Sequence, residues 1–433
     1  MTESRTGGLP VSACEPGQLL PLGSTGALGP AKLNVVITSP FVWPWVRRGS
    51  ERMVHEFSRY LTLKGHSVTV FSSGPVQRTE DRDGIAYHLS ANLFDTKFRQ
   101  FNTSHYFAFK LQSAIAKTTP DIVFCMNYFD AYAVLRARRR SGSSYRVVFQ
   151  SAGMLKRRHF WAAPLDAWFF RTVCLQADHT LAVSRAAAEV YRHEFNVTPS
   201  VLAPPVWIDT GPARMVENPN PFPGAPYILF ASDADDRRKG ASLLCKALPH
   251  VLARFPEVRL VFAGPASPQV RQALVAASGS ADNADKITFL GVGKVEDLHG
   301  LYQNAEVTVL PSVAESFGMV LVESLAAGTP VVGTQHGGIP EIINHAHIGQ
   351  TFEPGQIKKG QAHNVQGLAT AICKVLERGK TPETSAACKA RAQQFSWDTL
   401  GPVYEALLQQ AVAGDTMQTG HSSRPARPGA MHD

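Results

Sequence analysis

The sequence lacks the patterns that would mark a membrane-spanning, secreted or dinucleotide-dependent protein. No apolar run approaches the ~18 residues that a membrane-spanning helix needs, and no basic segment followed by an apolar core opens the chain. The six cysteines are scattered without Cys-x-x-Cys spacing, which favours reduced thiols and a cytoplasmic protein. No G-x-G-x-x-G motif occurs, which counts against a dinucleotide oxidoreductase.

Charged residues make up only 18% of the 433 residues, while 44% are hydrophobic, so the chain can bury the cores of two domains. The charge is unevenly placed. Between residues 31 and 210, Lys and Arg outnumber Asp and Glu by 23 to 13, and the rest of the chain is close to neutral. This half either faces an acidic partner or carries solvated arginines. Without zinc-finger spacing or aromatic RNA-stacking motifs, nucleic acid is not an expected partner.

Short apolar runs alternate with helical periodicity along most of the chain. Residues 33–39, 52–64 and 67–72 read as a strand, a helix and a strand, which form a βαβ unit. Further strands are predicted at 121–125, 146–150, 179–183, 227–231, 259–264, 287–291 and 307–310, and a helix at 242–255. The pattern predicts an α/β protein with two doubly wound, Rossmann-like domains that face a central cleft.

The composition also suggests where these domains begin and end. Segments rich in Gly, Pro and Ser at 1–30 and 413–433 are expected to be disordered, and the proline-rich segment 212–226 reads as a linker. The first domain is therefore expected at 31–211 and the second at 227–396, followed by a terminal helix at 397–412.

The most informative segment places two carboxylates eight residues apart. An apolar, alanine-rich helix opens at Phe317-Gly318 and stops at Gly328, with Glu315 in the loop before it and Glu323 on its face. The free N–H groups and the positive end of the helix dipole between the two acids suit a phosphate. An anion cradle flanked by two acids that can bind hydroxyl groups indicates a nucleotide-sugar site.

The segment Glu315-Ser-Phe-Gly-Met-Val-Leu-Val-Glu323 resembles the E-x7-E signature of retaining glycosyltransferases of family 4, which have the GT-B fold. The resemblance implies that Glu315 contacts the donor sugar and that Glu323 holds the ribose hydroxyls. It implies backbone contacts to the sugar or diphosphate from Phe317, Gly318, Met319 and Val320. It further implies that the terminal helix returns to the first domain, and that the nucleoside diphosphate-sugar is a co-substrate with no additional cofactor.

Two adjacent cations, Arg238 and Lys239, follow the first strand of the second domain and precede Gly240. Arginine can neutralise a diphosphate as a fork and lysine as a point charge. The Lys-Gly pair matches the family loop that stabilises the leaving diphosphate, which makes both cations catalytic candidates. Asp233-Ala-Asp235 also resembles a metal-binding D-x-D motif, but the two cations could neutralise the diphosphate without metal, so no metal site is expected.

Other family motifs are matched by shorter segments. Gly49, in Arg48-Gly-Ser-Glu-Arg52, resembles a loop glycine that approaches the donor phosphate between the first strand and the first helix. Gly264 and Val292 lie in segments that resemble the walls of the nucleotide pocket. His336-Gly-Gly-Ile-Pro-Glu341 matches a turn at the donor pocket, in which a structural role is expected for the last two residues.

The acceptor side departs from the family pattern. Many members carry His-Gly after a strand of the first domain, whereas this chain reads Phe149-Gln-Ser-Ala-Gly153 there. A retaining enzyme can use a leaving-phosphate oxygen as the proton acceptor, so a protein base is dispensable. Farther along, basic residues 156–158 precede Trp161 and Trp168, a mixture that suits either an anionic bilayer surface or a core helix with a solvated basic turn.

These features favour a cytoplasmic, metal-independent, retaining glycosyltransferase. It would move a hexose-type sugar from a nucleoside diphosphate-sugar to a hydroxyl of a saccharide, a lipid-linked saccharide or a small aglycone, in polysaccharide or glycoconjugate biosynthesis, with an anionic membrane surface as a candidate partner. The alternative is a nucleotide-sugar epimerase or hydrolase on the same fold, which would need no acceptor groove. A non-catalytic nucleotide-sugar sensor is disfavoured because Glu315, Glu323 and the cation pair are all present.

Overall fold

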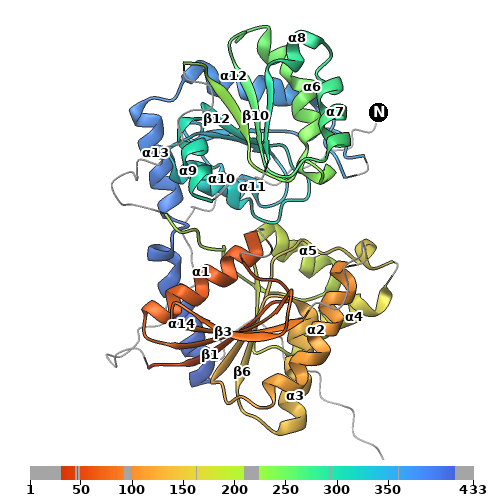
Figure 1. The fold of residues 1–433 in the computed structure, drawn as a ribbon, viewed down its shortest axis with the longest axis vertical. Helices are drawn as coiled ribbons and strands as arrows, with labels where there is room; N and C mark the ends of the chain where they lie inside the picture. Colours follow the sequence, from red (N-terminus) through yellow and green to blue (C-terminus); the bar gives the residue numbers. More distant parts are fainter. Residues whose placement is uncertain are drawn as a thin grey trace, which may run out of the picture.

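The protein folds into two α/β domains, which lie one above the other in Figure 1. The computed structural model describes residues 31–43, 46, 49–91, 99–161, 163–208, 224–291, 295–358 and 360–414. Each domain is built around a sheet that is wholly or mostly parallel. The predicted fold class is therefore confirmed. The predicted linker, lead-in and tail lie almost wholly outside the described residues.

In the described part of the first domain, eight strands form one sheet in the order β3-β4-β2-β1-β5-β6-β7-β8. They are β1 (Asn34–Thr38), β2 (Ser67–Gly74), β3 (Arg78–Arg82), β4 (Ile85–Ala91), β5 (Ile122–Cys125), β6 (Arg146–Ser151), β7 (His179–Ala182) and β8 (Ser200–Val201). All neighbours pair in parallel except β3 with β4. The sequence pattern missed this polar edge hairpin, because β3 is composed of charged and polar residues and shows no apolar run.

Helices connect these strands across both faces of the sheet. They are α1 (Gly49–Leu63), α2 (Arg99–Ile115), α3 (Tyr128–Ser141), the 3-10 helix η1 (Arg157–Phe160), α4 (Pro164–Gln176) and α5 (Arg185–Phe195). Helix α1 begins three residues earlier than predicted. Glycine has a low helix propensity, so the residues before Arg52 gave no helical signal.

The described part of the second domain has a parallel sheet in the order β11-β10-β9-β12-β13-β14. Its strands are β9 (Tyr227–Phe230), β10 (Arg259–Ala263), β11 (Ile287–Gly291), β12 (Val307–Leu310), β13 (Val331–Thr334) and β14 (Gly349–Phe352). Its helices are η2 (Arg237–Lys239), α6 (Ala241–Leu252), α7 (Pro268–Ala277), α8 (Ala281–Ala284), α9 (Val295–Asn304), α10 (Met319–Ala326), α11 (Ile339–Ile342), α12 (Val365–Arg378) and α13 (Pro382–Gln393). The strand order reverses at β9, as it does at β1 in the first domain, and such reversals open a crevice at the carboxyl ends of strands.

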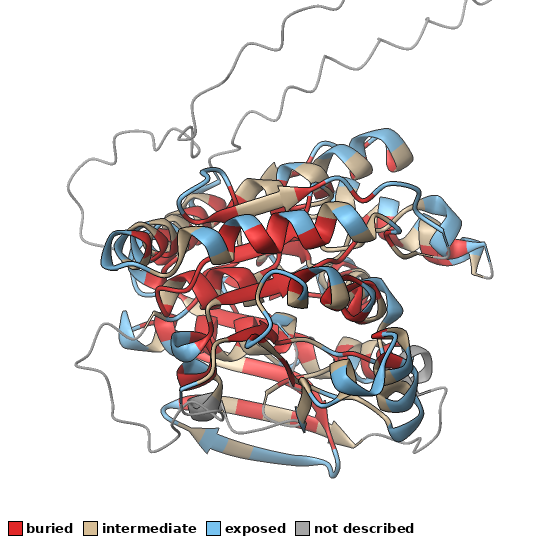
Figure 2. Ribbon diagram, turned by 90° about the horizontal axis from the view of Figure 1, so that it is seen from above, coloured by how far each residue is buried: buried red, intermediate tan, exposed pale blue. Residues whose placement is uncertain are grey.

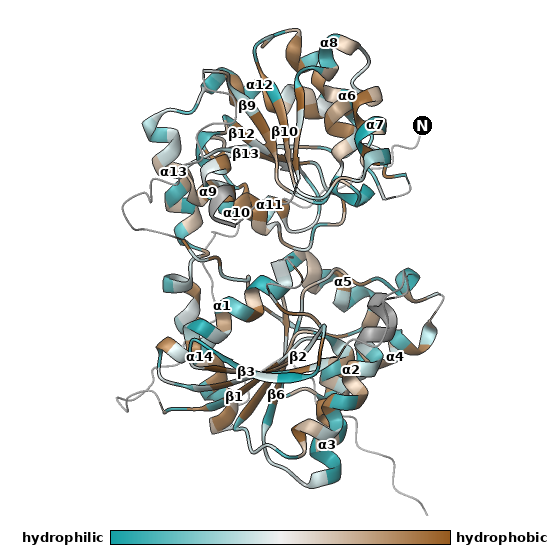
Figure 3. Cartoon of the chain, in the orientation of Figure 1, coloured by the Kyte–Doolittle hydropathy of each residue, from teal (hydrophilic) through white to brown (hydrophobic). Residues whose placement is uncertain are grey.

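The central strands are the most apolar and most buried parts of both domains. Figure 3 shows hydrophobic strands at the centre of each domain with mixed helices around them, and Figure 2 shows buried strands inside the molecule and an exposed strand at its edge. Central strands such as β5 and β9 are buried at every position. This pattern arises because helices cover both faces of a parallel sheet.

The terminal helix α14 (Trp397–Ala413) packs against the first domain. The ring of Trp397 stacks on Phe57 and Tyr60 of α1, with centroids 5.7 and 5.3 Å apart. Farther along the helix, Tyr404 contacts Phe57 as well, and its hydroxyl accepts a hydrogen bond from Gln150 of β6. The chain therefore returns to its first core after completing the second domain (Figure 1).

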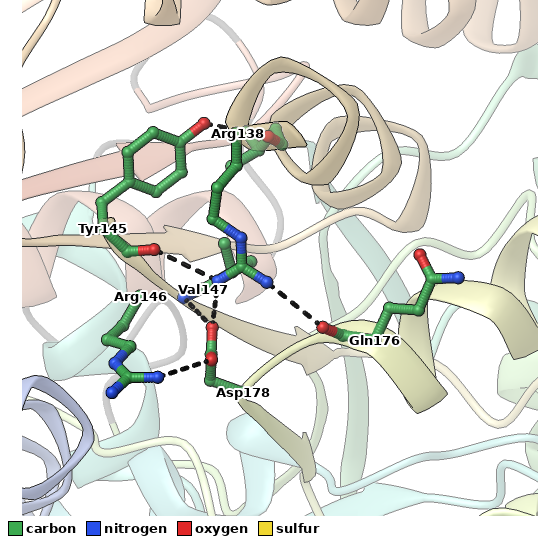
Figure 4. A network of polar contacts seen from close by, with 7 residues as sticks. Arg138, Tyr145, Arg146, Val147, Gln176 and Asp178 are labelled. Atoms are coloured by element: carbon green, nitrogen blue, oxygen red, sulfur yellow. Dashed lines mark hydrogen bonds and ion pairs between the residues drawn. The ribbon is translucent and has the colours of Figure 1, made fainter. Parts of the chain in front are cut away.

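A polar network connects α3 with the amino ends of β6 and β7 in the first sheet (Figure 4). The carboxylate of Asp178, just before β7, accepts from Arg138 of α3, from Arg146 of β6 and from the N–H of Val147. Burial would raise the pKa of Asp178, but the hydrogen bond from Val147 and the two guanidinium groups hold this pKa below its ordinary value. The network thereby ties α3 to the ends of two strands.

Among residues 31–414, with the gaps given above, no helix combines the length and the apolar character needed to cross a membrane.

Candidate active site

Glu315 and Lys239 meet in two loops at the carboxyl end of the second sheet. Strand β9 leads into η2, which ends at Lys239, and β12 leads into the loop that carries Glu315. The ammonium of Lys239 lies 2.7 Å from Oε2 of Glu315. The N–H of Val313 also donates to the carbonyl of Arg238 at 3.2 Å, so the backbones of the two loops are joined. The structure thus brings these two predicted catalytic residues together.

Gly240 makes this close approach of the two loops possible. Its φ of +82° lies in the left-handed region that favours glycine. A Cβ at this position would lie only 2.4 Å from the carbonyl oxygen of Pro311, in the loop before Glu315. The Lys-Gly pair therefore combines a charge with the backbone freedom that brings this charge to Glu315.

Arg238 adopts a different arrangement from its neighbour. Its Nε and Nη2 donate to the two carboxylate oxygens of Asp236 at 3.0 and 2.7 Å, and 62% of its side chain is exposed. Asp236 also caps η2 by accepting from the N–H of Arg238. The fork uses two of the five N–H donors of the Arg238 guanidinium, whereas the ammonium of Lys239 faces the Glu315 loop.

The predicted anion cradle lies at the start of α10. Gly318 is the N-cap residue, with φ of +115°, and Met319 and Val320 form the first turn. The first N–H groups of a helix have no partner within it, and they carry the positive end of the dipole. Phe317 is buried and packs edge-to-face on Phe395, with centroids 5.4 Å apart. Its side chain thereby anchors the loop from which the helix starts.

Gly49 brings the first domain against this helix start. A Cβ on Gly49 would lie 2.8 Å from Sδ of Met319, so α1 and α10 approach each other closely. The expectation of a loop glycine was wrong, since Gly49 is the first residue of α1. Arg48, the preceding residue, lies outside the described residues.

Glu323 points from α10 into the contact between the domains. Its Oε1 accepts from Nη1 of Arg52 at 2.8 Å, and its Oε2 accepts from the hydroxyl of Tyr302 at 2.9 Å. Burial raises the pKa of Glu323, and the charge of Arg52 and the Tyr302 hydrogen bond oppose this rise. Sequence reasoning missed Arg52 and Tyr302 as partners. The only signal was the position of Arg52 next to the predicted loop glycine motif.

Of the two other residues predicted at the nucleotide pocket, the structure describes Gly264. Gly264 follows β10, and a Cβ there would lie 2.2 Å from the carbonyl oxygen of Ser232, which follows β9 closely. Glycine is therefore needed where these two strand ends approach each other. Val292 lies outside the described residues, just after β11.

Gly337 and Gly338 lie close against the backbone of the loop that carries Glu315. A Cβ on Gly337 would lie 2.2 Å from the carbonyl oxygen of Glu315, and one on Gly338 would lie 2.4 Å from that of Ser316. The N–H of Gly338 donates to the carbonyl of Glu315 at 3.1 Å. Gly337 and Gly338 thus position the backbone that carries Glu315, the predicted catalytic acid.

Glu341 joins the second domain to the first. Its carboxylate oxygens accept from the N–H groups of Arg185 and Ala186, each at 3.0 Å, at the start of α5. A carboxylate at a helix N-terminus satisfies free donors and complements the dipole. The structural role expected for Glu341 thus extends to a contact between domains, which the sequence alone did not indicate.

Asp233 and Asp235, which resemble a D-x-D motif, accept hydrogen bonds within the loops around η2. Asp233 accepts from the N–H of Asp235, and Asp235 accepts from the N–H and hydroxyl of Ser267. In the part of the chain that the structure describes, no group of three or more His, Cys, Asp or Glu side chains is arranged to hold a metal ion. Both aspartates thus have a structural role.

A cavity of about 370 Å³ lies at the carboxyl ends of β1, β5 and β6 in the first domain. Its lining combines aromatic and hydroxyl-bearing side chains, including Tyr128, Phe129, Phe149, Ser39 and Ser151. Gln150, in the segment 149–153 where many family members carry His-Gly, is buried and donates to the hydroxyl of Tyr404 at 2.7 Å and to the carbonyl of Leu202 at 3.2 Å. Because β6 and the residues that follow it up to Gly153 include no histidine, this segment contributes none to the cavity.

Each of the two domains matches a glycosyltransferase family model. Residues 215–395 match the model described as "Glycosyl transferases group 1", and residues 47–208 match "Glycosyltransferase Family 4". A phosphatidyl-myo-inositol mannosyltransferase from Propionibacterium freudenreichii is 28% identical over 247 residues. These residues are 56% of this chain and 58% of that relative, so the match covers little more than half of either protein.

Solved structures resemble the whole architecture. Sucrose-phosphate synthase from Thermosynechococcus elongatus superposes with a TM-score of 0.72 at 18% identity, over 88% of this chain and 99% of that one. Anabaena Alr3699/HepE, solved in complex with UDP and glucose, superposes with a TM-score of 0.64 at 17% identity, over 87% and 99%. At these identities the likeness concerns the fold. The two family matches, the E-x7-E segment and this fold together show that the chain belongs to the family 4 glycosyltransferases of the GT-B fold.

Proposed function

We propose that the protein transfers a hexose-type sugar from a nucleoside diphosphate-sugar to an acceptor hydroxyl, with retention at the anomeric carbon and without a metal ion. The observation that carries this proposal is the ion pair of Lys239 and Glu315 beside the start of α10, where the second domain meets the first. The Alr3699/HepE structure contains UDP and glucose, which supports a donor of this class.

Each residue of the site has a role that follows from its chemistry. The amides from Phe317 to Val320 bind the diphosphate at the helix N-terminus. Lys239 stabilises the charge that develops on the leaving diphosphate, and Arg238 contributes the N–H donors that its fork with Asp236 does not use. Glu315 accepts hydroxyls of the donor sugar and positions the anomeric carbon.

Glu323 receives the ribose hydroxyls. Each of its oxygens has a second lone pair beyond those used by Arg52 and Tyr302. Two hydroxyl donors of a ribose can therefore be accepted while both protein contacts are kept.

The chemistry proposed for retention takes place on one face of the donor. The bond between the anomeric carbon and the diphosphate breaks while the acceptor oxygen forms the new glycosidic bond on the same face, and an oxygen of the leaving diphosphate takes the proton of the acceptor hydroxyl. The segment 149–153, where many family members carry His-Gly, contains no histidine, and the side-chain amide of Gln150 donates to Tyr404 and Leu202 and is not a base at neutral pH. The cavity of the first domain holds the acceptor, which is a saccharide, a lipid-linked saccharide or a small aglycone.

A test starts with thermal shifts against a panel of nucleotide-sugars, because a ligand that binds only the folded state raises the melting temperature. We expect one donor to stabilise the protein. Calorimetry with the matching free diphosphate should then give at least about tenfold weaker binding for Glu323→Gln, the usual effect of losing a hydrogen bond to a charged group. Equal affinities would reject the ribose role.

The same donor, labelled in the sugar, should remain unchanged until an acceptor is added. Conversion of the sugar without acceptor would indicate an epimerase or hydrolase instead. A panel in which no nucleotide-sugar raises the melting temperature would reject the proposed donor class altogether.

We also propose that α4 and the turn before it rest on an anionic membrane surface. Trp161, Leu165 and Trp168 are 86%, 69% and 54% exposed, and Arg157 and Arg158 are exposed beside them. Exposed tryptophans next to basic residues suit the interface of an anionic bilayer, where each cation contributes about 1 kcal/mol. The name of the mannosyltransferase relative includes a phospholipid, which fits such a location.

Vesicle sedimentation tests this surface. The protein should bind vesicles that contain phosphatidylglycerol, and binding of a Trp161→Ser/Trp168→Ser variant should fall at least about fivefold, since burial of each aromatic contributes on the order of 1 kcal/mol. Leu63→Ser is a matched control, because Leu63 is 67% exposed at the end of α1, on the other side of this domain in Figure 1. Equal binding by all three proteins would contradict the proposal.

A further inference from the structure

Glu323, the carboxylate proposed to receive the ribose, is held by a side chain of the other domain. Arg52 lies on α1 of the first domain, 271 positions away in the sequence, and its Nη1 is 2.8 Å from Oε1 of Glu323. The E-x7-E segment belongs wholly to the second domain. The position of Glu323 therefore depends on a group that the second domain does not supply.

Arg52 is itself fixed by contacts within the first domain. Its Nε donates to Oε1 of Glu56 at 2.7 Å, one turn along α1. The other oxygen of Glu56 accepts from Nε1 of Trp397 at 2.9 Å. Because Trp397 is buried against α1, this chain of contacts links the terminal helix α14, through Arg52, to Glu323.

The opposite side of Glu323 is equally fixed. The hydroxyl of Tyr302, on α9, donates to Oε2 at 2.9 Å, and Tyr302 is buried. Thr329 donates to the carbonyl of Tyr302 at 2.6 Å, which holds the end of α9 in place. Arg52 and Tyr302 thus hold the carboxylate between two domains and leave one lone pair on each oxygen for a ligand.

We propose that Arg52 is a positioning residue for donor binding, which orients the carboxylate of Glu323 toward the ribose and makes the first domain part of the nucleotide site. This inference rests on the proposed function. It implies that the affinity for a nucleoside diphosphate depends on the contact between α1 and α10 as well as on the second domain itself.

The electrostatic surroundings of Glu323 provide a readout that a purely structural role would not change. The charged and titratable groups that face it are Arg52 and Glu56 from α1 and Tyr302 from α9. Burial raises the pKa of Glu323, and Arg52 is the group that most strongly opposes this rise. Without Arg52, burial and the nearby Glu56 would raise this pKa further. A neutral carboxyl is a weaker acceptor than a carboxylate, so binding would weaken as the pH falls through the new, higher pKa.

The experiment is calorimetry of UDP and GDP binding between pH 5.5 and 8.5. We expect Arg52→Met to weaken binding of the nucleotide that the wild type prefers by about tenfold at pH 7, the usual effect of a lost contact to a charged group. The loss should grow toward pH 5.5 more steeply than in the wild type. Arg52→Lys should restore the pH profile but only part of the affinity, because one ammonium cannot reach Glu56 and Glu323 in the same geometry as a guanidinium.

Two further variants isolate the contact. In a Glu323→Gln background, Arg52→Met should have little additional effect, since the two side chains act through one contact. Arg59→Met is the matched control, because Arg59 lies on the same helix and contacts Trp207 instead, so its affinity and pH profile should equal those of the wild type. Circular dichroism melting curves show whether each variant is folded.

Wild-type affinity and pH profile in Arg52→Met would overturn the inference, as would losses that simply add in the double variant. If the wild type binds neither UDP nor GDP, and no nucleotide-sugar of the panel raises its melting temperature, the proposed function fails first and the inference fails with it. The two failures are thus told apart by the wild-type titration.

Discussion

Replacing Lys239 with alanine is expected to lower the turnover number by at least about 10²-fold, which is the usual effect of removing one preorganised donor from a developing charge. Lys239 is held 2.7 Å from Glu315 by the backbone of Gly240 and the Pro311 loop, so its charge is in place before the reaction begins. Since the charge on the leaving diphosphate is largest in the transition state, kcat should fall more than donor affinity.

The measurement is steady-state kinetics with the donor identified by thermal shift. Lys246→Ala is a suitable control, because it removes an exposed lysine from α6, the next helix along the chain, without touching the Glu315 loop. Its rate should be close to that of the wild type. An unchanged turnover number in Lys239→Ala would remove diphosphate stabilisation from the roles of this residue.

Gly338→Ala is expected to reduce both stability and turnover, although Gly338 bears no side chain and its φ is ordinary for any residue. The added Cβ would lie 2.4 Å from the carbonyl oxygen of Ser316 and 2.8 Å from Cα of Phe317. Both neighbours are backbone atoms, so the Glu315 loop would have to move. We expect a loss of about 1–3 kcal/mol in the free energy of unfolding, as in overpacked cores.

The turnover number should fall by about 10²-fold if the displacement of Glu315 reaches ~1 Å, because catalysis depends steeply on such positions. Urea denaturation and steady-state kinetics measure the two effects separately. Gly74→Ala is the control, since its Cβ would meet only side-chain atoms of Leu89, the nearest at 3.2 Å, far along the sequence from the site. A Gly338→Ala protein with wild-type stability and turnover would show that the loop can adapt, contrary to this argument.

The two predictions differ in how far the sequence anticipated them. Lys239 was a candidate from its place after a strand and before a glycine, and Gly240 has the left-handed backbone that such a pair requires. The glycines at 337 and 338 were recognised only as a turn. Their close approach to Glu315 depends on how β13 lies beside β12, which no local pattern reveals.

The hydrogen-bond partner of Arg238 was likewise not predictable from the local sequence. The sequence placed it beside Lys239 as a second cation for the diphosphate, but the fork with Asp236 was not anticipated. Both residues belong to one short 3-10 helix, and the direction of each side chain depends on the exact turn geometry. Neighbouring residues of the same charge can therefore face different partners.

The sequence by itself determined the two α/β domains, the helix that follows Gly318 and the pairing of Lys239 with a nearby glycine. These features depend on apolar periodicity and on glycine at particular turns, which act over a few residues. Only the tertiary structure decided that Arg52 meets Glu323, that Glu341 caps α5 and that Trp397 reaches Glu56. Such contacts join residues more than 150 positions apart, and they are set by how the two sheets and the returning helix pack, which no local pattern encodes.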